Sequence, residues 1–336
     1  MRENLEKLSN YVQKTLNITA IGEILIDFTD CGRSQYGTRL FSQNPGGAPG
    51  NVAAAAARLG LKSAFIGKVG DDMHGEFLRA SLAGAGVDTS GLVKDGSYFT
   101  TLAFVQLGED GERSFSFARK HGADTQLRFD EIPDRLLSET QVLHFGTIAM
   151  TDEPERTAQL KCIERARSCG ALLSFDPNYR DTLWSSAGQF VRCTRELLSF
   201  ADLVKISEEE MELVTGETDP GRAIEYLLGR GARIAAVTLG KRGAIAGSRT
   251  SGLVYREGRK CEPIDATGAG DAFWGGFLSA MLTSGTEPER AGEHELGVWL
   301  DFANGVGAYC TAHFGGISGM PTQEQLGEFF ENSEQK

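Results

Sequence analysis

Apolar and polar positions along this chain predict an alternating order of strands and helices. Residues 18–28 form a nearly continuous β-prone run, which predicts a strand buried on both faces. The alanine-rich stretch that ends at Gly60 predicts a helix, and residues 62–70 predict the next strand. The same order continues with a helix at 72–85, a strand at 141–145, a helix at 152–169, a strand at 171–175, a helix at 187–200, a strand at 202–206, helices at 208–214 and 221–230, and a strand at 234–239. This β-α-β series predicts an α/β domain with a mostly parallel sheet.

Two strand-like runs, 98–107 and 113–119, interrupt this order. Residues 108–111, Gly-Glu-Asp-Gly, predict the turn of a hairpin, and no helix separates the two runs. A hairpin inserted in a β-α-β series is expected to stand outside the main sheet, as a cover or a dimerisation surface. Nearer the C-terminus, we expect a short hairpin over 244–256 and a long helical segment over 289–311.

Composition and charge narrow the range of functions. The 336 residues are 40% hydrophobic and 24% charged, which is typical of a globular protein with one large α/β domain or two small ones. With 34 basic and 46 acidic residues the net charge is −12, and no basic block is interleaved with aromatic residues. This balance argues against nucleic acid or an anionic membrane as a partner. The five histidines form no H-E-x-x-H pair, which argues against a metal-dependent hydrolase.

Cysteine usage and the N-terminal residues bear on the compartment. The six cysteines are scattered and show no C-x-x-C spacing, which predicts reduced thiols in a cytoplasmic protein. Residues 1–16 are polar and contain no apolar segment, so we interpret them as a tail or a surface helix rather than a secretory signal. No apolar run approaches the length that spans a bilayer.

The stretch 265–271, Asp-Ala-Thr-Gly-Ala-Gly-Asp, is the strongest candidate for a chemical site. Gly268, Ala269 and Gly270 are small enough for backbone N–H groups to converge on an anion at a helix N-terminus, as in a phosphate cradle. Asp271 would then be a general base beside the phosphate. The alternative is an ordinary glycine-rich turn followed by a first-turn acid. The stretch matches neither the dinucleotide fingerprint nor a Walker A loop.

A second glycine-rich segment, 44–52, precedes the alanine-rich helix. Its glycines permit close backbone approach, and Asn51 is interpreted either as a helix cap or as a contact to a ligand hydroxyl. Asp27 lies near the end of the first predicted strand, where ligands gather in open α/β sheets. The alternative for Asp27 is a loop or capping acid.

These segments together resemble the two signatures of the ribokinase-like (PfkB) carbohydrate kinases. The first signature is Gly-Gly-Ala-Pro-Gly-Asn-Val-Ala at 46–53 with Gly-Lys-Val-Gly-Asp-Asp at 67–72, and the second is 265–273. The likeness extends from about Thr19 to Pro321. It implies a three-layer α/β/α fold with a central, mostly parallel sheet and a small β lid.

The resemblance also implies how the chain is organised and what reaction it performs. Residues 17–336 would form a single kinase domain, with the lid at about 28–43 and 97–119. The domain would transfer the γ-phosphoryl group of ATP to a primary hydroxyl of a small sugar, with Asp271 as the base. Closure of the lid would exclude water from the reaction.

Individual site residues follow from the same resemblance. The anion hole is assigned to Gly268, Ala269 and Gly270, and the sugar contacts to Asp27, Gly46, Gly47, Asn51 and Arg119 as well as to Asp271. The alternative for Arg119 is a solvated arginine of the lid. Nucleotide contacts are assigned to Thr238, Gly240, Gly243, Gly268, Gly270 and Asn304.

Two cations are also implied. Glu210 matches the glutamate that organises Mg²⁺ through water in the family, although Ser207 stands where many members have asparagine. A monovalent cation, expected to be K⁺, is assigned to Asp265 and Thr267, where it would help to shape the loop.

Three short segments favour the fructokinase branch of the family. They are Gly-Gly-Ala-Pro at 46–49, Asp-Pro-Asn at 176–178 followed by Arg180 and Leu183-Trp184, and Lys-Ile-Ser at 205–207. The expected reaction is therefore the conversion of fructose to fructose 6-phosphate. The alternatives are a 2-keto-3-deoxygluconate kinase, a nucleoside kinase with a base-stacking lid aromatic among Phe104, Phe115 and Phe117, or a non-catalytic sugar-binding regulatory protein.

Dimers are common in the family, so a homodimer is expected. The lid hairpin offers apolar side chains for such an interface, namely Phe99, Leu102, Phe104 and Val105.

Overall fold

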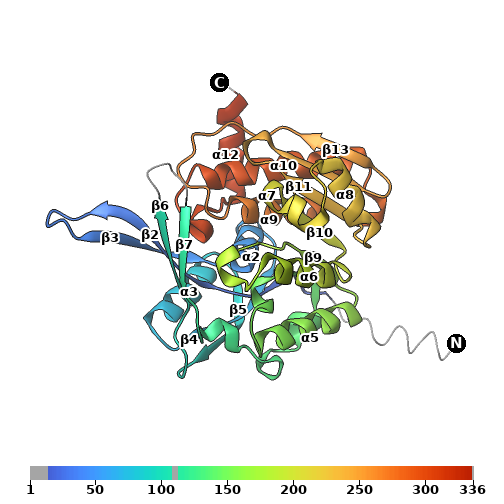
Figure 1. The fold of residues 1–336 in the computed structure, drawn as a ribbon. Helices are drawn as coiled ribbons and strands as arrows, with labels where there is room; N and C mark the ends of the chain where they lie inside the picture. Colours follow the sequence, from blue (N-terminus) through green and yellow to red (C-terminus); the bar gives the residue numbers. More distant parts are fainter. Residues whose placement is uncertain (1–13, 108–112, 335–336) are drawn as a thin grey trace.

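The structure is a computed structural model that describes residues 14–107 and 113–334 (Figure 1). The predicted turn at 108–111 and the first thirteen residues of the predicted N-terminal tail lie outside the described residues. None of the described helices combines the length and apolar character needed to cross a bilayer.

A nine-stranded sheet runs through the centre of the described chain, in the order β13-β12-β11-β10-β9-β8-β1-β4-β5. Neighbours from β11 to β5 are parallel, and only β11–β12 and β12–β13 are antiparallel. The predicted mostly parallel sheet and the predicted C-terminal hairpin are thus confirmed. The strands are β1 (Leu16–Ile21), β4 (Ser63–Gly70), β5 (Asp88–Asp95), β8 (Thr140–Phe145), β9 (Leu172–Phe175), β10 (Leu203–Ser207), β11 (Ile234–Thr238), β12 (Ala244–Ser248) and β13 (Gly252–Arg256).

Helices cover both faces of this sheet, which gives the three layers that the resemblance implied (Figure 1). One face carries α2 (Ala48–Arg58), α3 (Met73–Gly84), α9 (Ala269–Ser284) and α10 (Glu293–Thr311), with α11 (Gly316–Gly319) and α12 (Gln323–Glu334) packed outside them. The other face carries α4 (Arg135–Ser138), α5 (Glu155–Ser168), α6 (Ala187–Leu198), α7 (Glu208–Thr215) and α8 (Pro220–Gly229).

Helix α9, which begins at the predicted phosphate cradle, is anchored by its aromatic side chains. Trp274 stacks on Phe277, whose ring meets that of Trp299 from α10 edge to face. All three are almost fully buried, and burial of each large side chain contributes about 1.5–3 kcal/mol. Trp274 Nε1 also donates a hydrogen bond of 2.9 Å to Ser174 Oγ of β9. The N-terminus of α9 is therefore held firmly above the carboxyl end of the central sheet.

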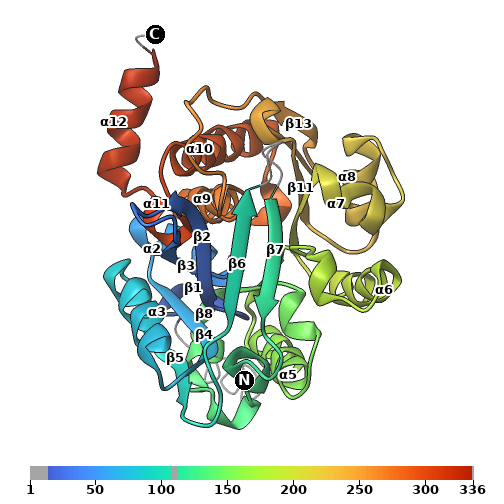
Figure 2. The same ribbon diagram turned by 60° about the vertical axis from the view of Figure 1, so that its left-hand side comes forward.

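A separate four-stranded sheet stands out from this body in the order β3-β2-β6-β7 (Figures 1 and 2). It consists of β2 (Leu25–Arg33), β3 (Arg39–Gly46), β6 (Leu102–Leu107) and β7 (Arg113–Ala118). Strands β2 and β6 are parallel to each other, and β3 and β7 run antiparallel to them. The hairpin that interrupts the β-α-β order thus belongs to a sheet outside the main one.

The prediction of one continuous strand over 18–28 is wrong. The chain leaves the central sheet at Gly22, whose φ of 146° is open to glycine but not to the β-prone residues around it. The run is therefore divided into β1 of the central sheet and β2 of the outer sheet. Asp27 consequently lies in β2, opposite Asn44 of β3, and not at the end of a central strand.

Two smaller differences have local causes. Strand β5 was not predicted, because its sequence, Asp-Thr-Ser-Gly-Leu-Val-Lys-Asp, is polar and only partly buried at the edge of the sheet. The expected helical segment at 289–311 begins later, at Glu293, since Pro288–Arg290 forms a separate 3-10 turn.

Candidate active site

The predicted phosphate cradle forms the start of α9. Gly268 is the N-cap with φ of 75°, and a Cβ there would lie 2.9 Å from Gly316 Cα, so both conformation and space require glycine. Ala269 N donates a hydrogen bond of 3.3 Å to the carbonyl of Ala266, whereas the N–H groups of Gly270 and Asp271 have no carbonyl within the helix to bond. The loop therefore presents donors and a favourable dipole to an anion.

Asp271 is buried in the first turn of α9, and its Oδ2 accepts a hydrogen bond of 2.8 Å from Asn51 Nδ2. The two glycine-rich segments, far apart in the sequence, thus meet at these side chains. Asn51 Oδ1 is buried and has no hydrogen-bond partner among the described residues. An unsatisfied buried acceptor is costly, so a ligand hydroxyl that donates to Asn51 would be bound favourably here.

The electrostatic surroundings of Asp271 suit a general base. Burial raises the pKa of Asp271, while Lys205, Asn51, Arg180 and Asn178 act in the opposite direction. A raised pKa brings a carboxylate closer to the basicity needed to accept a proton from a hydroxyl. Asn178 itself adopts a left-handed φ of 51°, a conformation that asparagine tolerates better than most residues.

A buried ion pair lies behind the cradle. Lys205 Nζ is 2.8 Å from Asp176 Oδ2, and a Cβ on Gly270 would lie 3.2 Å from the same nitrogen. Burial raises the pKa of Asp176 to about 7 against the opposing effect of Lys205, and Asp176 Oδ1 has no partner within the described residues. Despite its burial, the pKa of Lys205 is raised by Asp176, Glu210 and Asp271.

The sequence reasoning did not assign a chemical role to Lys205, Asp176, Asn178 or Arg180. The sequence marks residues 176–180 as a plausible ligand loop at a strand end, and it otherwise uses these residues as markers of a branch of the family. A usable signal was present, because Asp176 directly follows β9 and Lys205 lies near the carboxyl end of β10. Ligand groups gather at that edge of an open parallel sheet.

Four of the predicted sugar contacts, Asp27, Gly46, Gly47 and Asn51, lie at or near the start of α2. A Cβ on Gly46 would overlap Asp27 Oδ2, and a Cβ on Gly47 would lie 2.5 Å from the carbonyl oxygen of Glu23. Gly47 also has φ of 113° as the N-cap of α2. Asn51 follows in the same first turn and contacts the proposed base through its hydrogen bond to Asp271.

The predicted nucleotide contacts other than Gly268 and Gly270 lie on the β11–β13 side of the molecule. Thr238 ends β11, and Gly240 and Gly243 turn the chain with φ of 57° and 101°. Asn304 is buried in α10, where its Nδ2 donates to the carbonyls of Arg256 and Glu257. That amide nitrogen therefore holds the chain after β13, and the contact of Asn304 to adenine stays a prediction.

The predicted cation ligands are hard oxygen donors already held by backbone N–H groups. Glu210 Oε1 accepts from Tyr179 N and Oε2 from Ser207 N, at 2.6 and 2.9 Å. Each oxygen keeps a further lone pair, so a water-mediated contact to Mg²⁺ fits Glu210. Asp265 Oδ1 accepts from both Thr267 N and Thr267 Oγ1, and its Oδ2 accepts from Gly315 N. This oxygen-rich junction of two loops is compatible with K⁺.

Some sites bind a metal ion through protein side chains alone, without a ligand or water. The parts of the chain that the structure describes contain no group of three or more His, Cys, Asp or Glu side chains arranged to hold a metal ion. A divalent cation bound through Glu210 would therefore need ligands from substrate phosphates or water, as Mg²⁺ commonly has.

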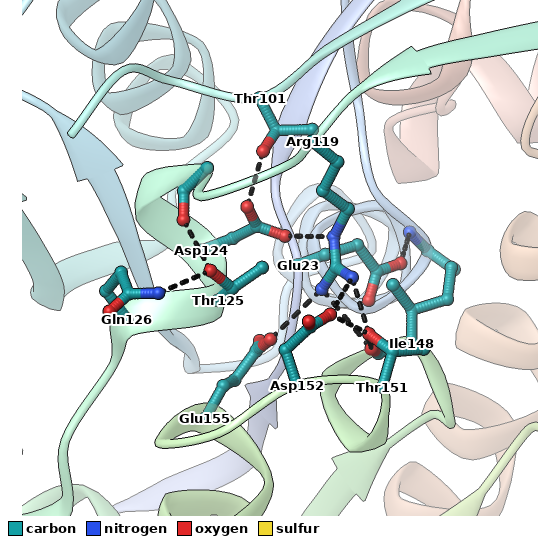
Figure 3. Close-up of polar contacts among 12 residues, drawn as sticks. Glu23, Thr101, Arg119, Asp124, Thr125, Gln126, Ile148, Thr151, Asp152 and Glu155 are labelled. Carbon is teal, nitrogen blue, oxygen red and sulfur yellow. Dashed lines mark hydrogen bonds and ion pairs between the residues drawn. The ribbon is translucent and has the colours of Figure 1, made fainter. Parts of the chain in front are cut away.

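Arg119 is buried, and the alternative of a solvated lid arginine is wrong. Its guanidinium bonds Asp124, Asp152 and Glu155, together with Thr151 Oγ1 and the carbonyl of Ile148 (Figure 3). Arg119 also borders a cavity of about 630 Å³ between β7 and the 3-10 turn at Asp181–Leu183. Its contact to a sugar stays a prediction, but most of its hydrogen-bonding capacity is used within the protein.

Comparison with known proteins agrees with this geometry. Residues 15–323 match the pfkB family carbohydrate kinase model. Fructokinase-1 of Zea mays is 39% identical over 320 residues, which cover 94% of this chain and 98% of that protein.

Solved structures of fructokinases are similar to this chain in sequence and in fold. A fructokinase from Xylella fastidiosa with bound ATP is 33% identical with a TM-score of 0.84, over 96% of this chain and all of the other. A double mutant of the fructokinase from Vibrio cholerae O395, solved with fructose, ADP and potassium ion, is 33% identical with a TM-score of 0.82, over 95% and 99% of the two chains. The chain therefore belongs to the pfkB family of carbohydrate kinases.

Proposed function

We propose that this protein transfers the γ-phosphoryl group of ATP to fructose and releases fructose 6-phosphate and ADP. The observation that carries the proposal is the meeting of Asn51 and Asp271 beside the cradle, with Asn51 Oδ1 left as a buried acceptor for a sugar hydroxyl. The identity to fructokinases over nearly the whole chain supports fructose as the substrate.

The chemistry follows from the roles of the residues. Asp271 accepts the proton of the attacking hydroxyl, whose oxygen then bonds the γ-phosphorus while the bond to the ADP oxygen breaks. The first-turn N–H groups of α9 stabilise the negative charge on the transferred phosphoryl group. Lys205 lies behind these groups and favours the ionised form of Asp271.

Two cations complete the proposal. Mg²⁺ would neutralise phosphate charge and is assigned to Glu210 through water, and K⁺ is assigned to Asp265 and Thr267. The potassium ion bound in the Vibrio cholerae structure supports a monovalent site in the family. Sugar and ATP contacts otherwise remain as assigned from the sequence.

A panel of sugars tests the substrate. We expect ADP release, measured in a coupled assay with ATP and Mg²⁺ in K⁺ buffer, to be fastest with fructose. No turnover of fructose with good turnover of 2-keto-3-deoxygluconate or a nucleoside would contradict fructose and leave the kinase reaction intact. Sugar binding by calorimetry without turnover of any sugar would instead indicate a non-catalytic protein.

The nucleoside alternative has little support in the lid. Phe104 stacks on Phe28 at 5.4 Å and meets Phe41 edge to face, so its ring is engaged within the lid. The side chain of Phe115 lies outside the described ones, and Phe117 is half-buried beside the cavity bordered by Arg119.

The Glu210→Gln variant tests the magnesium assignment. Glutamine keeps the size of the side chain but loses a carboxylate charge that attracts Mg²⁺ through water. We expect the Mg²⁺ concentration that gives half-maximal rate to rise severalfold. A Mg²⁺ titration identical to that of the wild type would contradict the assignment, and Glu209→Gln is the matched control, since Glu209 is exposed in the same turn.

We further propose a single cytoplasmic kinase domain that dimerises through its outer sheet. The six cysteines are free thiols, which supports a reducing compartment. Phe99 is 79% exposed and offers apolar surface, whereas Val105 is buried and does not. A monomer in light scattering at micromolar concentration would contradict the dimer.

A further inference from the structure

All four strands of the outer sheet meet the body of the protein at one polar cluster (Figure 3). Glu23 precedes β2, Ala48 follows β3, Thr101 precedes β6 and Arg119 follows β7. Asp124 accepts hydrogen bonds from both Thr101 Oγ1 and Arg119 Nε, so it joins the bases of β6 and β7. The residues that flank the four strands therefore form two bonded groups, Thr101–Asp124–Arg119 and Glu23–Ala48, which interact electrostatically through Arg119 and Glu23.

Arg119 connects that cluster to the body. Its Nη2 donates to Glu155 Oε2 at 3.1 Å and to the carbonyl of Ile148, and its Nη1 donates to Thr151 Oγ1. Glu155 begins α5 on the face of the central sheet opposite α2. The guanidinium thus ties the end of β7 to elements that do not belong to the outer sheet.

Glu23 bonds the start of α2, near the predicted sugar contacts Gly47 and Asn51. It is 2% exposed, and its Oε1 accepts a hydrogen bond of 3.0 Å from Ala48 N, the first residue of α2. Gly47, the N-cap of α2, has no side chain to bond the helix N-terminus, so Glu23 caps the helix from another part of the chain. Asn51, one turn further, holds Asp271.

The charges of the cluster are unbalanced. One guanidinium pairs with the buried carboxyl groups of Asp124 and Glu155 and with the more exposed Asp152, and it interacts electrostatically with the buried carboxyl group of Glu23. Burial raises the pKa of Glu23 to about 7, although the Ala48 N–H and Arg119 lower it, and burial raises the pKa of Glu155 well above its usual range. With a pKa of about 7, Glu23 changes its charge near neutral pH.

We propose that Glu23, Arg119 and Asp124 form the hinge of the lid and act as positioning residues that set the affinity for the sugar. This inference rests on the proposed sugar kinase function. The hinge holds the bases of the four strands at a fixed distance from the start of α2, so loosening it moves the lid and the sugar contacts together. Ionised Glu23 caps α2 and attracts Arg119 more strongly than the neutral acid does.

The Glu23→Gln variant tests this hinge. Glutamine retains an acceptor for Ala48 N but loses the charge that faces Arg119, Asp124, Asp152 and Glu155. We expect the KM for the sugar to rise about tenfold, with kcat within about threefold of the wild type and the KM for ATP unchanged. In the wild type the KM for the sugar should fall as the pH rises from 6 to 8, and in Glu23→Gln this dependence should be flattened.

Hydrogen exchange provides a readout that does not depend on activity. We expect faster exchange in Glu23→Gln at the amides of β2, β3 and β6, with β8 to β11 unchanged. Thr101→Val, which removes the hydrogen bond to Asp124, should give the same pattern in weaker form and serves if Glu23→Gln does not fold. Glu164→Gln, on the exposed side of α5, is the matched control.

The outcomes separate the hinge from the proposed function. The sugar is the one that the panel identifies, so failure of fructose does not affect the comparison of variants. Wild-type KM and wild-type exchange in both variants would overturn the hinge. A lower thermal midpoint with an unchanged KM would also overturn it, because it would assign Glu23 a purely structural role.

Discussion

Replacement of Asp271 by asparagine is expected to lower kcat by about 10²- to 10⁴-fold, the range for loss of a general base. Asparagine can still accept a hydrogen bond from Asn51 Nδ2, so the geometry of the site should survive. Sugar and ATP binding, measured by calorimetry, should remain close to those of the wild type. The loss would then lie in the chemical step alone.

The pH dependence of the wild-type enzyme provides a second check on the base. Because burial raises the pKa of Asp271, the ionised form is lost as the pH falls through that raised value. We expect kcat to decrease on the acidic side and the residual rate of Asp271→Asn to lack this decrease. Asp301→Asn, on the exposed side of α10, is the matched control. Turnover by Asp271→Asn near the wild-type rate would disprove its role as base.

The parts of the site that the sequence predicted best are those set by local backbone requirements. Gly268 has a positive φ and lies close to Gly316, so the position requires glycine and can be recognised in the sequence. The apolar helix that follows Gly268 could likewise be predicted from its own local sequence. The family resemblance then paired this loop with the segment around Asn51, and the structure joins the two through Asp271.

What the sequence could not predict depends on contacts between distant segments. The apolar run at 18–28 has the same sequence pattern whether it stays in one sheet or passes to another. The chain changes sheets at Gly22, which packs closely against Pro49 of the distant helix α2. For Arg119 the sequence leaves open a sugar contact and a solvated lid arginine, because Asp124 of η1 (Ala123–Gln126) is near in sequence but its other buried acidic partner, Glu155, comes from α5. Its burial follows from the packing of β7 and η1 against α5.

The Lys205→Met variant should combine a large loss of stability with a shift in the pH profile. Removal of one partner from a buried ion pair leaves Asp176 without compensation, which typically costs about 3–5 kcal/mol. The pKa of Asp271 should rise further, because Lys205 is the largest opposing influence on it. The acidic limb of kcat should therefore move to higher pH, and the midpoint of urea unfolding should fall.

The Lys205→Met/Asp176→Leu double variant separates these two effects. Replacement of both members of a buried pair by apolar residues is often neutral for stability, so urea unfolding should return towards the wild-type midpoint. The pH profile should stay displaced, because Asp271 still lacks the ammonium group behind the cradle. If the double variant instead regains the wild-type profile, Lys205 acts only to neutralise Asp176. If Lys205→Met alone leaves both the profile and the unfolding midpoint unchanged, the ion pair contributes neither to stability nor to the base.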